Sequence, residues 1–524
     1  MKENTGLAHR ATMRKRIKTV PVPCCDFLYM QKRQILPVFF CVMVLSCSQL
    51  ASAQRFDALN SEVKNYVRVS TQKVILEHVQ IIDGTGAAPV QDQNISIENG
   101  KIVAISPGAD QPASEGVTIL NLKGYSVMPG IVGMHDHMFY LGRPNLKSDL
   151  DFEGPGLFLE MSFSAPRLYL ANGVTTARTT GSSNPISDVR LKHAIETGTV
   201  PGPHLDVTGP YLEGTSSNQN LQMYQLTGPE DARQVVAFWA DHGVTSFKAY
   251  SHITREEMSA AVKEAHKRGL KVTGHLCSVS YTEAVEIGID NLEHGFLANT
   301  ELDPDKKPDV CSNNGDYTIE HTIPGSAYAD KLIATLVSHH VAITSTLPST
   351  AASVPVDTTT DGKPAVRTAV LEAMSPVLRE AYFYDRNRPR STKRNVALVL
   401  KREMDMERAF VAAGGLLMAG PDPVGIGGNL PGFGDQYEIE LLVQAGFTPV
   451  EAIRIATLNG AIFLGRQDQI GSVAAGKNAD LVVMKGDPAA HISDIENVEI
   501  VFKDGVGYDS KKLLDSVKGR YGEF

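Results

Sequence analysis

The central part of the chain alternates short apolar segments with stretches of helical periodicity. In one helical stretch, Thr254 is followed three residues later by Glu257, and an apolar stripe follows at Met258, Ala261, Val262 and Ala265. Strands that alternate with helices predict parallel βα units. Eight strands, the number that closes a (β/α)8 barrel, are expected at residues 127–134, 174–180, 205–209, 244–250, 270–275, 289–294, 341–347 and 416–422.

The two flanks of this region have a different pattern, in which short β-branched segments are separated by turn dipeptides. Residues 83–86 (Asp-Gly-Thr-Gly) follow segment 73–82, and the turn dipeptide Asn99-Gly100 interrupts segment 95–105. The similar segments 479–484 and 498–503 precede Asp504-Gly505. We interpret the flanks as halves of one small β-sandwich. The predicted fold is α/β, a TIM (β/α)8 barrel at 128–469 with a β-sandwich built from 54–127 and 470–524.

The first 53 residues form a separate, basic segment. They contain eight basic and two acidic residues, a net charge of +6, although the whole chain carries −9. Lys32-Arg33 precedes the apolar run 35–47, and Ala51-Ser52-Ala53 matches a cleavage signal, so residues 1–53 are predicted to be a leader with a signal peptide. The apolar run is shorter than the roughly 20 residues of a membrane span. We therefore expect a periplasmic or extracellular protein without stable membrane insertion after leader removal.

Composition narrows the classes of partner. The chain of 524 residues is 42% hydrophobic, as in globular proteins, and without the leader it carries a charge of −15, which argues against nucleic acid as a partner. Only Cys277 and Cys311 lie outside the leader, so a disulfide scaffold is excluded. One bridge between them is an alternative, but two buried thiols are the favoured interpretation.

Several predicted strands end in residue types that bind metals. The first runs into His135-Asp136-His137, where alternation places both imidazoles on one side and Asp136 on the other. Three further strands close on His275, His294 and Asp422. Because the active site of a barrel lies at the C-terminal ends of its strands, these side chains are expected to converge. Imidazole and carboxylate together suit zinc or a similar divalent ion.

Lys248 interrupts the otherwise apolar strand 244–250. Such a lysine could extend its amine to solvent or pair with a carboxylate. If it is buried near metals, desolvation lowers its pKa, and the neutral amine can take up carbon dioxide as a carbamate. A carbamate is a carboxylate and can bridge two cations.

This set of residues resembles that of the amidohydrolase superfamily, from about Val74 to the C-terminal region. Three later segments strengthen the resemblance, at residues 445–452, 456–461 and 471–483. A lysine on strand four is similar to the two-metal branch, which includes prolidase-like dipeptidases and N-acyl amino-acid hydrolases. The resemblance implies two metal ions, with zinc as the expected metal. His135, His137 and Asp422 would bind one ion, His275 and His294 the other, and carboxylated Lys248 would bridge both.

The resemblance also implies a reaction, the hydrolysis of an amide bond in a dipeptide or N-acyl amino acid by a metal-bridged hydroxide. Asp422 is expected to move the proton from water to the leaving amine. Tyr250, on the same side of the strand as Lys248, is either an oxyanion donor or an ordinary rim tyrosine. His252, Arg178 and Glu213 are expected near the barrel top and are candidates for substrate binding.

We expect the substrate to be a small molecule. The chain departs from the dipeptidase-like pattern at two places, and two other functions remain as alternatives. Many dipeptidase-like relatives carry Asp at the end of strand two and Gly-Gly-His-Gly after strand three, where this chain has 177–181 and 211–215. One alternative is a one-metal deaminase or cyclic-amide hydrolase with uncarboxylated Lys248. The other is an exported binding protein on the same scaffold, without catalysis. Similar enzymes often form homo-oligomers.

Overall fold

The computed structural model describes residues 56–142, 157–215, 222–312, 314–353, 367–387 and 395–523. The predicted leader, residues 1–53, lies outside the described residues. Within the described ranges, no helix has both the length and the apolar character that a membrane crossing requires.

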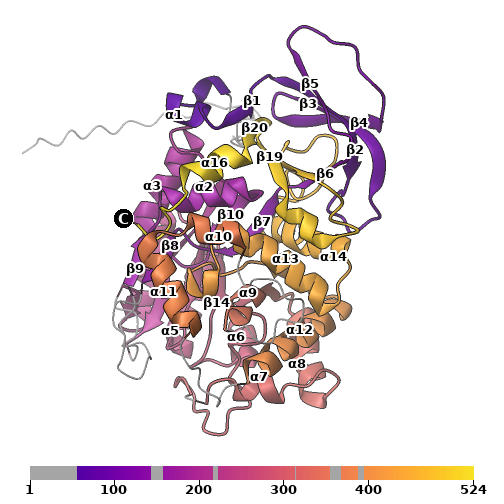
Figure 1. Cartoon of the computed structure of the whole chain (residues 1–524). Helices are drawn as coiled ribbons and strands as arrows, with labels where there is room; N and C mark the ends of the chain where they lie inside the picture. The colour runs from indigo at the N-terminus through magenta and orange to yellow at the C-terminus, as the bar shows by residue number, and fades with distance from the viewer. Residues whose placement is uncertain are drawn as a thin grey trace, which may run out of the picture. The chain divides into compact units, whose positions relative to one another are not determined.

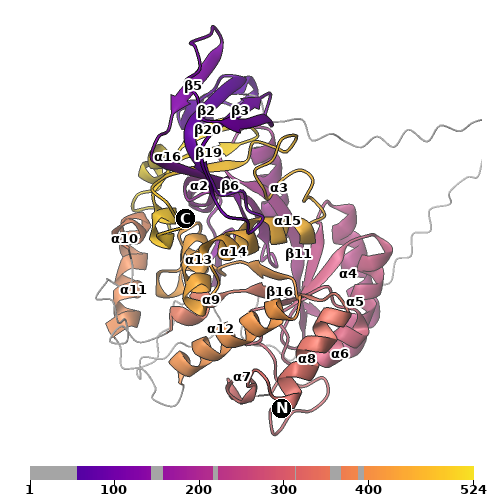
Figure 2. The same cartoon turned by 90° about the vertical axis from the view of Figure 1, so that its right-hand side faces the viewer.

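A barrel of parallel strands forms the centre of the described part (Figures 1 and 2). Its eight strands, in hydrogen-bonded order, are β7 (Ile131–Asp136), β10 (Val174–Thr179), β11 (His204–Gly214), β13 (Ser246–Ala249), β14 (Lys271–Gly274), β15 (Asn291–Glu293), β16 (Ala342–Ser345) and β17 (Leu417–Ala419). At the seam between β17 and β7, the backbone N–H of Asp422 donates to the carbonyl of His135 at 3.0 Å. The predicted (β/α)8 barrel is confirmed.

Helices cover the outside of these strands, as Figure 2 shows for α4, α5, α6 and α8. The longer helices are α2 (Ser164–Ala171), α3 (Pro185–Glu196), α4 (Pro229–Asp241), α5 (Arg255–Lys267), α6 (Tyr281–Ile287), α8 (Ala327–Ser338), α11 (Pro376–Asn387), α12 (Val396–Ala412) and α13 (Phe433–Ala445). In α5, Thr254 and Glu257 form the predicted capping box, and the predicted apolar stripe is buried. Local sequence therefore defines where this helix begins and which face it buries.

The two flanks of the chain meet in one sheet beside the barrel (Figure 1). It contains β1 (Val67–Val69), β2 (Lys73–Ile81), β3 (Val90–Glu98), β4 (Lys101–Pro107), β5 (Val117–Asn121), β6 (Tyr125–Pro129), β18 (Leu481–Lys485), β19 (Val498–Lys503) and β20 (Val506–Asp509). β18 joins the flanks by pairing antiparallel with β6. Apolar side chains from both flanks, including Leu76, Ile97, Leu481 and Phe502, share one buried cluster.

Two hairpin turns bring the flanks into close contact. Asn99 and Gly100 have φ of 50° and 80°, and Asp504 and Gly505 have φ of 51° and 80°, the left-handed pairs that two-residue hairpins require. A Cβ added at Gly505 would lie 2.6 Å from the Cα of Gly100. Glycine at position 505 therefore permits both the turn and the approach of the other hairpin.

The segment 127–134, predicted as one strand, is two strands in different sheets. β6 ends at Pro129 in the outer sheet, and β7 begins the barrel at Ile131. Between them, the N–H of Gly130 donates to the carbonyl of Asp480 at 2.8 Å, and a Cβ there would overlap Thr175. The side chains are buried on both sides of the break, so hydrophobicity shows no interruption.

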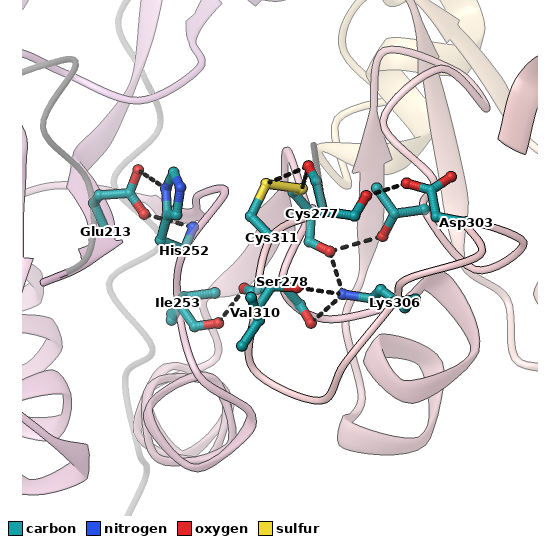
Figure 3. Close-up of a disulfide and its surroundings, with 11 residues drawn as sticks. Glu213, His252, Ile253, Cys277, Ser278, Asp303, Lys306, Val310 and Cys311 are labelled. Atoms are coloured by element: carbon teal, nitrogen blue, oxygen red, sulfur yellow. Dashed lines mark hydrogen bonds and ion pairs between the residues drawn. A yellow bond between two sulfur atoms is a disulfide. The ribbon is translucent and has the colours of Figure 1, made fainter. Parts of the chain in front are cut away.

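Cys277 and Cys311 form a disulfide, so the favoured expectation of two free thiols is wrong (Figure 3). Cys277 follows β14, and Cys311 lies 34 residues later in the long connection before α8. Lys306, from the same connection, donates to the carbonyls of Cys277 and Ser278 at 2.5 Å. This connection is therefore fixed to the loop after β14, a spatial relation that spacing in the sequence does not encode.

We expect loss of the disulfide to lower the free energy of unfolding by about 4 kcal/mol, because a closed loop of this length restricts the unfolded chain. Urea unfolding should show this loss when reductant is added to the wild-type protein. It should show the same loss in Cys311→Ser without reductant. The matched control is Cys311→Ser with reductant, which should show no further loss. Free thiols at both cysteines in the oxidised protein would contradict the assignment.

Candidate metal centre

The six predicted metal ligands come together at the C-terminal ends of the barrel strands. His135 and His137 lie at the end of β7, and Lys248 lies on β13. His275, His294 and Asp422 follow β14, β15 and β17. The parallel arrangement brings these strand ends to one side of the barrel, so residues far apart in the sequence become neighbours.

Asp422 is the centre of this group. Its Oδ1 lies 3.0 Å from His137 Nε2 and 3.7 Å from His135 Nε2, and its Oδ2 lies 4.0 Å from His294 Nδ1. Donor atoms of His135, His294 and Asp422 all lie within 4.8 Å of one another, a grouping that could hold a metal ion. The ring centre of His275 lies 4.4 Å from that of His294 and completes the set.

The electrostatics of the group suit cation binding. Burial and the nearby Lys248 lower the pKa of His135 to about 4 and that of His275 to about 3, so both imidazoles are neutral at pH 7. Burial would raise the pKa of Asp422, but His135 and His137 hold it well below its usual range. Neutral imidazoles and an ionised carboxylate are the protonation states that bind metals.

His294 provides a direct test of whether the residues fit a metal. Its Nδ1 lies 2.9 Å from Thr346 Oγ1, which fixes the orientation of the ring. Its Nε2 is buried, and the described residues offer it no hydrogen-bond partner. A metal ion would satisfy this nitrogen, and a hydrogen-bonded second nitrogen is typical of histidine ligands.

Lys248 is buried beside His135 and does not reach solvent. Its Nζ lies 3.1 Å from His135 Nε2 and 3.4 Å from the carbonyl of Thr180. Among the described residues, no carboxylate forms an ion pair with it within 4.0 Å. Burial lowers its pKa to about 8, which increases the fraction of reactive neutral amine. Lys248 therefore neither extends its amine to solvent nor pairs with a described carboxylate, so that alternative is wrong. A neutral amine in this position can react with carbon dioxide.

Arg178 lies beneath the ligands, and its predicted role in substrate binding is wrong. The side chain is fully buried, and its guanidinium donates to the carbonyl of Met134 at 2.6 Å and to Glu293 Oε1 at 2.7 Å. Glu293 Oε2 lies 2.9 Å from His135 Nδ1. Glu293 is not among the predicted site residues, although it directly precedes the predicted ligand His294. Its partners, His135 and Arg178, lie on β7 and β10, so only the folded barrel brings them next to Glu293 on β15.

Glu213 and His252 form a pair at the barrel mouth (Figure 3). Glu213 is buried; its Oε1 accepts the N–H groups of Gly214 and His252 at 2.8 and 2.7 Å, and its Oε2 lies 3.3 Å from His252 Nδ1. The His252 side chain is 26% exposed. Glu213 therefore fixes the loop and the imidazole, and His252 is the member of the pair that can face a ligand.

Tyr250 lies next to the ligand group, whereas Asp136 lies outside it. The Tyr250 ring centre lies 4.8 Å from that of His275, so this tyrosine borders the candidate site. Asp136 is fully buried beside Asp435, and burial together with Asp435 raises the pKa of Asp136 well above its usual range. As predicted from alternation, Asp136 does not belong to the ligand group.

Comparisons with known proteins point to one family. The model described as Amidohydrolase family matches residues 126–507. Over 52 residues, the chain is 44% identical to imidazolonepropionase of Micrococcus luteus, a match that covers 10% of this chain and 13% of that protein. Over 45 residues it is 53% identical to adenine deaminase of Klebsiella pneumoniae, which covers 9% and 7%. The chain thus spans small parts of these curated relatives.

Solved structures show the same fold over most of the chain. A Xaa-Pro dipeptidase with bound methionine has a TM-score of 0.61 at 20% identity, covering 83% of this chain and 100% of that one. Bottromycin amidohydrolase has a TM-score of 0.61 at 21% identity, covering 89% and 95%. Ochratoxinase of A. niger has a TM-score of 0.59 at 16% identity, covering 84% and 96%.

Replacement of Arg178 by Met should destabilise the protein by about 3–5 kcal/mol, because Glu293 would remain as an unpaired buried charge. Urea unfolding measures this change. Arg68→Met is the matched control, since Arg68 pairs with Glu499 at 3.5 Å on the exposed surface and should contribute about 1 kcal/mol or less. Equal stability of the two variants would contradict the role of Arg178.

Proposed function

The chain belongs to the amidohydrolase family, and from this premise we propose that it is a metal-dependent hydrolase that cleaves a carbon–nitrogen bond. The observation that carries the proposal is the convergence of four histidines, Lys248 and Asp422 in one buried group. The substrate we propose is a dipeptide or an N-acyl amino acid. The partly exposed His252 at the barrel mouth supports a substrate that carries a free carboxylate.

We propose that this group holds two divalent ions, with zinc as the metal. His135, His137 and Asp422 would hold one ion, His275 and His294 the other, and carboxylated Lys248 both. The buried, unpartnered Nε2 of His294 and the lowered pKa of Lys248 support this set. When bound, the ions supply a hydroxide at neutral pH and polarise the scissile carbonyl.

The chain's own side chains would then move the proton and bind the substrate. Asp422 accepts a proton from the attacking water and returns it to the leaving amine. The Tyr250 hydroxyl, on a ring whose centre lies 4.8 Å from that of His275, donates a hydrogen bond to the developing oxyanion. Glu213 orients His252 so that the imidazole binds the substrate carboxylate at the barrel mouth.

We further propose that the protein works outside the cytoplasm. The basic leader with its cleavage signal supports export. The disulfide between Cys277 and Cys311 is a second, independent support, since disulfides persist mainly in oxidising compartments. A periplasmic or extracellular hydrolase of small amides is consistent with both features.

The experiment that tests the metal centre is elemental analysis of protein purified without chelators and supplied with ¹³C-bicarbonate. We expect two metal ions per chain. We also expect a ¹³C carbamate signal in the wild-type protein, and Lys248→Met should abolish this signal. Amide hydrolysis should then be screened with dipeptides and N-acyl amino acids. One ion in an active enzyme would favour the deaminase or cyclic-amide alternative, and no metal under any loading would favour the binding protein.

Asp422→Asn should abolish nearly all turnover while the fold is kept, because the amide cannot accept the proton from water.

Tyr250→Phe should lower kcat about 100-fold with little change in KM, since the lost donor acts mainly in the transition state. Tyr224→Phe is the control, because Tyr224 is exposed and donates to Asp231 at 3.0 Å. Substantial activity in Asp422→Asn, or equal effects of the two tyrosine variants, would refute these roles.

A further inference from the structure

The turn that carries His294 has a strained backbone. His294 and Gly295 follow β15 directly, and both have left-handed φ, 61° and 56°. A left-handed backbone is uncommon for a histidine, and it persists only where surrounding contacts hold it. The direction of the His294 ring therefore depends on the contacts of this turn.

Glu403, on α12, makes the contact on the outer side of the turn. Its Oε1 accepts the backbone N–H of Phe296 at 2.6 Å. A Cβ at Gly295 would overlap this same oxygen, so the carboxyl group lies directly against the turn. From the barrel side, the N–H of Gly295 donates to the carbonyl of Thr344 at 2.9 Å. The turn is thus held between strand β16 and helix α12.

We propose that Glu403 is a positioning residue of the metal centre: by accepting the Phe296 N–H, it holds the left-handed turn that directs His294 Nε2 toward the metal. The inference rests on the proposed function, because it takes His294 as a ligand. Glu403 does not touch the metal or the substrate. It acts through the backbone of residues 294–296 alone.

The surroundings of Glu403 indicate that this buried carboxyl group is not there to stabilise the fold. The side chain is 3% exposed, and no described lysine or arginine pairs with it. Burial, opposed by the Phe296 hydrogen bond and reinforced by Glu438, raises its pKa to about 8. Burying a carboxyl group without a cation costs stability. An apolar side chain would avoid this cost but could not accept the Phe296 N–H.

Three conservative variants test the proposal by metal binding as well as activity. Glu403→Asp withdraws the carboxyl group by about one C–C bond, roughly 1.5 Å, and should lower affinity for one of two zinc ions about 10- to 100-fold in chelator competition. Its kcat should recover with excess zinc. Glu403→Gln keeps an accepting oxygen and should bind both ions with wild-type affinity.

Glu407→Asp is the matched control for a carboxyl group that is close to the turn but makes no hydrogen bond to it. Glu407 lies one turn further along α12, is buried, and accepts from Ser345 Oγ at 3.0 Å. Its Oε1 would lie 2.9 Å from a Cβ at Gly295, yet it accepts no hydrogen bond from the described residues. The Glu407→Asp variant should keep both ions. Wild-type affinity in Glu403→Asp, or equal losses in Glu403→Gln or Glu407→Asp, would overturn the inference. Absence of metal from the wild-type protein would instead refute the proposed function, so the two failures can be distinguished.

Discussion

The ion pair between Arg178 and Glu293 is the interaction on which the candidate site depends. Both side chains are fully buried at the base of the ligand group, where an unpaired charge would be costly. Arg178 binds one oxygen of Glu293 and leaves the other 2.9 Å from His135 Nδ1. A single contact therefore neutralises a buried charge and orients the first histidine, joining β10, β15 and β7.

Above this ion pair, the barrel mouth is organised by contacts between loops from different strands. Glu213 fixes His252, and the hydroxyl of Ser278 donates to the carbonyl of Ile253 at 2.5 Å, which links the loops after β13 and β14 (Figure 3). The disulfide extends this chain of contacts to the connection before α8. Because binding residues on loops must be held by a rigid scaffold, these contacts bear on substrate positioning.

Two candidate ligands have strained backbone conformations. Asp422, like His294, has a positive φ, 51°, and the side-chain amide of Asn429 donates to its carbonyl at 3.1 Å. Strain of this kind is found where the surrounding structure over-determines a residue, and it is common at functional sites. Residues other than glycine adopt this conformation infrequently, so the ligand geometry depends on tertiary contacts.

The sequence by itself determined the barrel, the joining of the two flanks and the positions of the six candidate ligands. Each followed from local pattern: strand alternation, turn dipeptides such as Asn99-Gly100, and ligand-type residues at strand ends. Only the tertiary structure decided the partners of Arg178, Glu293 and Glu403, the disulfide and the break at Gly130. These features join residues far apart in the sequence, such as Arg178 and Glu293 at 115 positions and Gly130 and Asp480 at 350. A buried polar side chain is assigned its partner by packing rather than by its neighbours in the sequence.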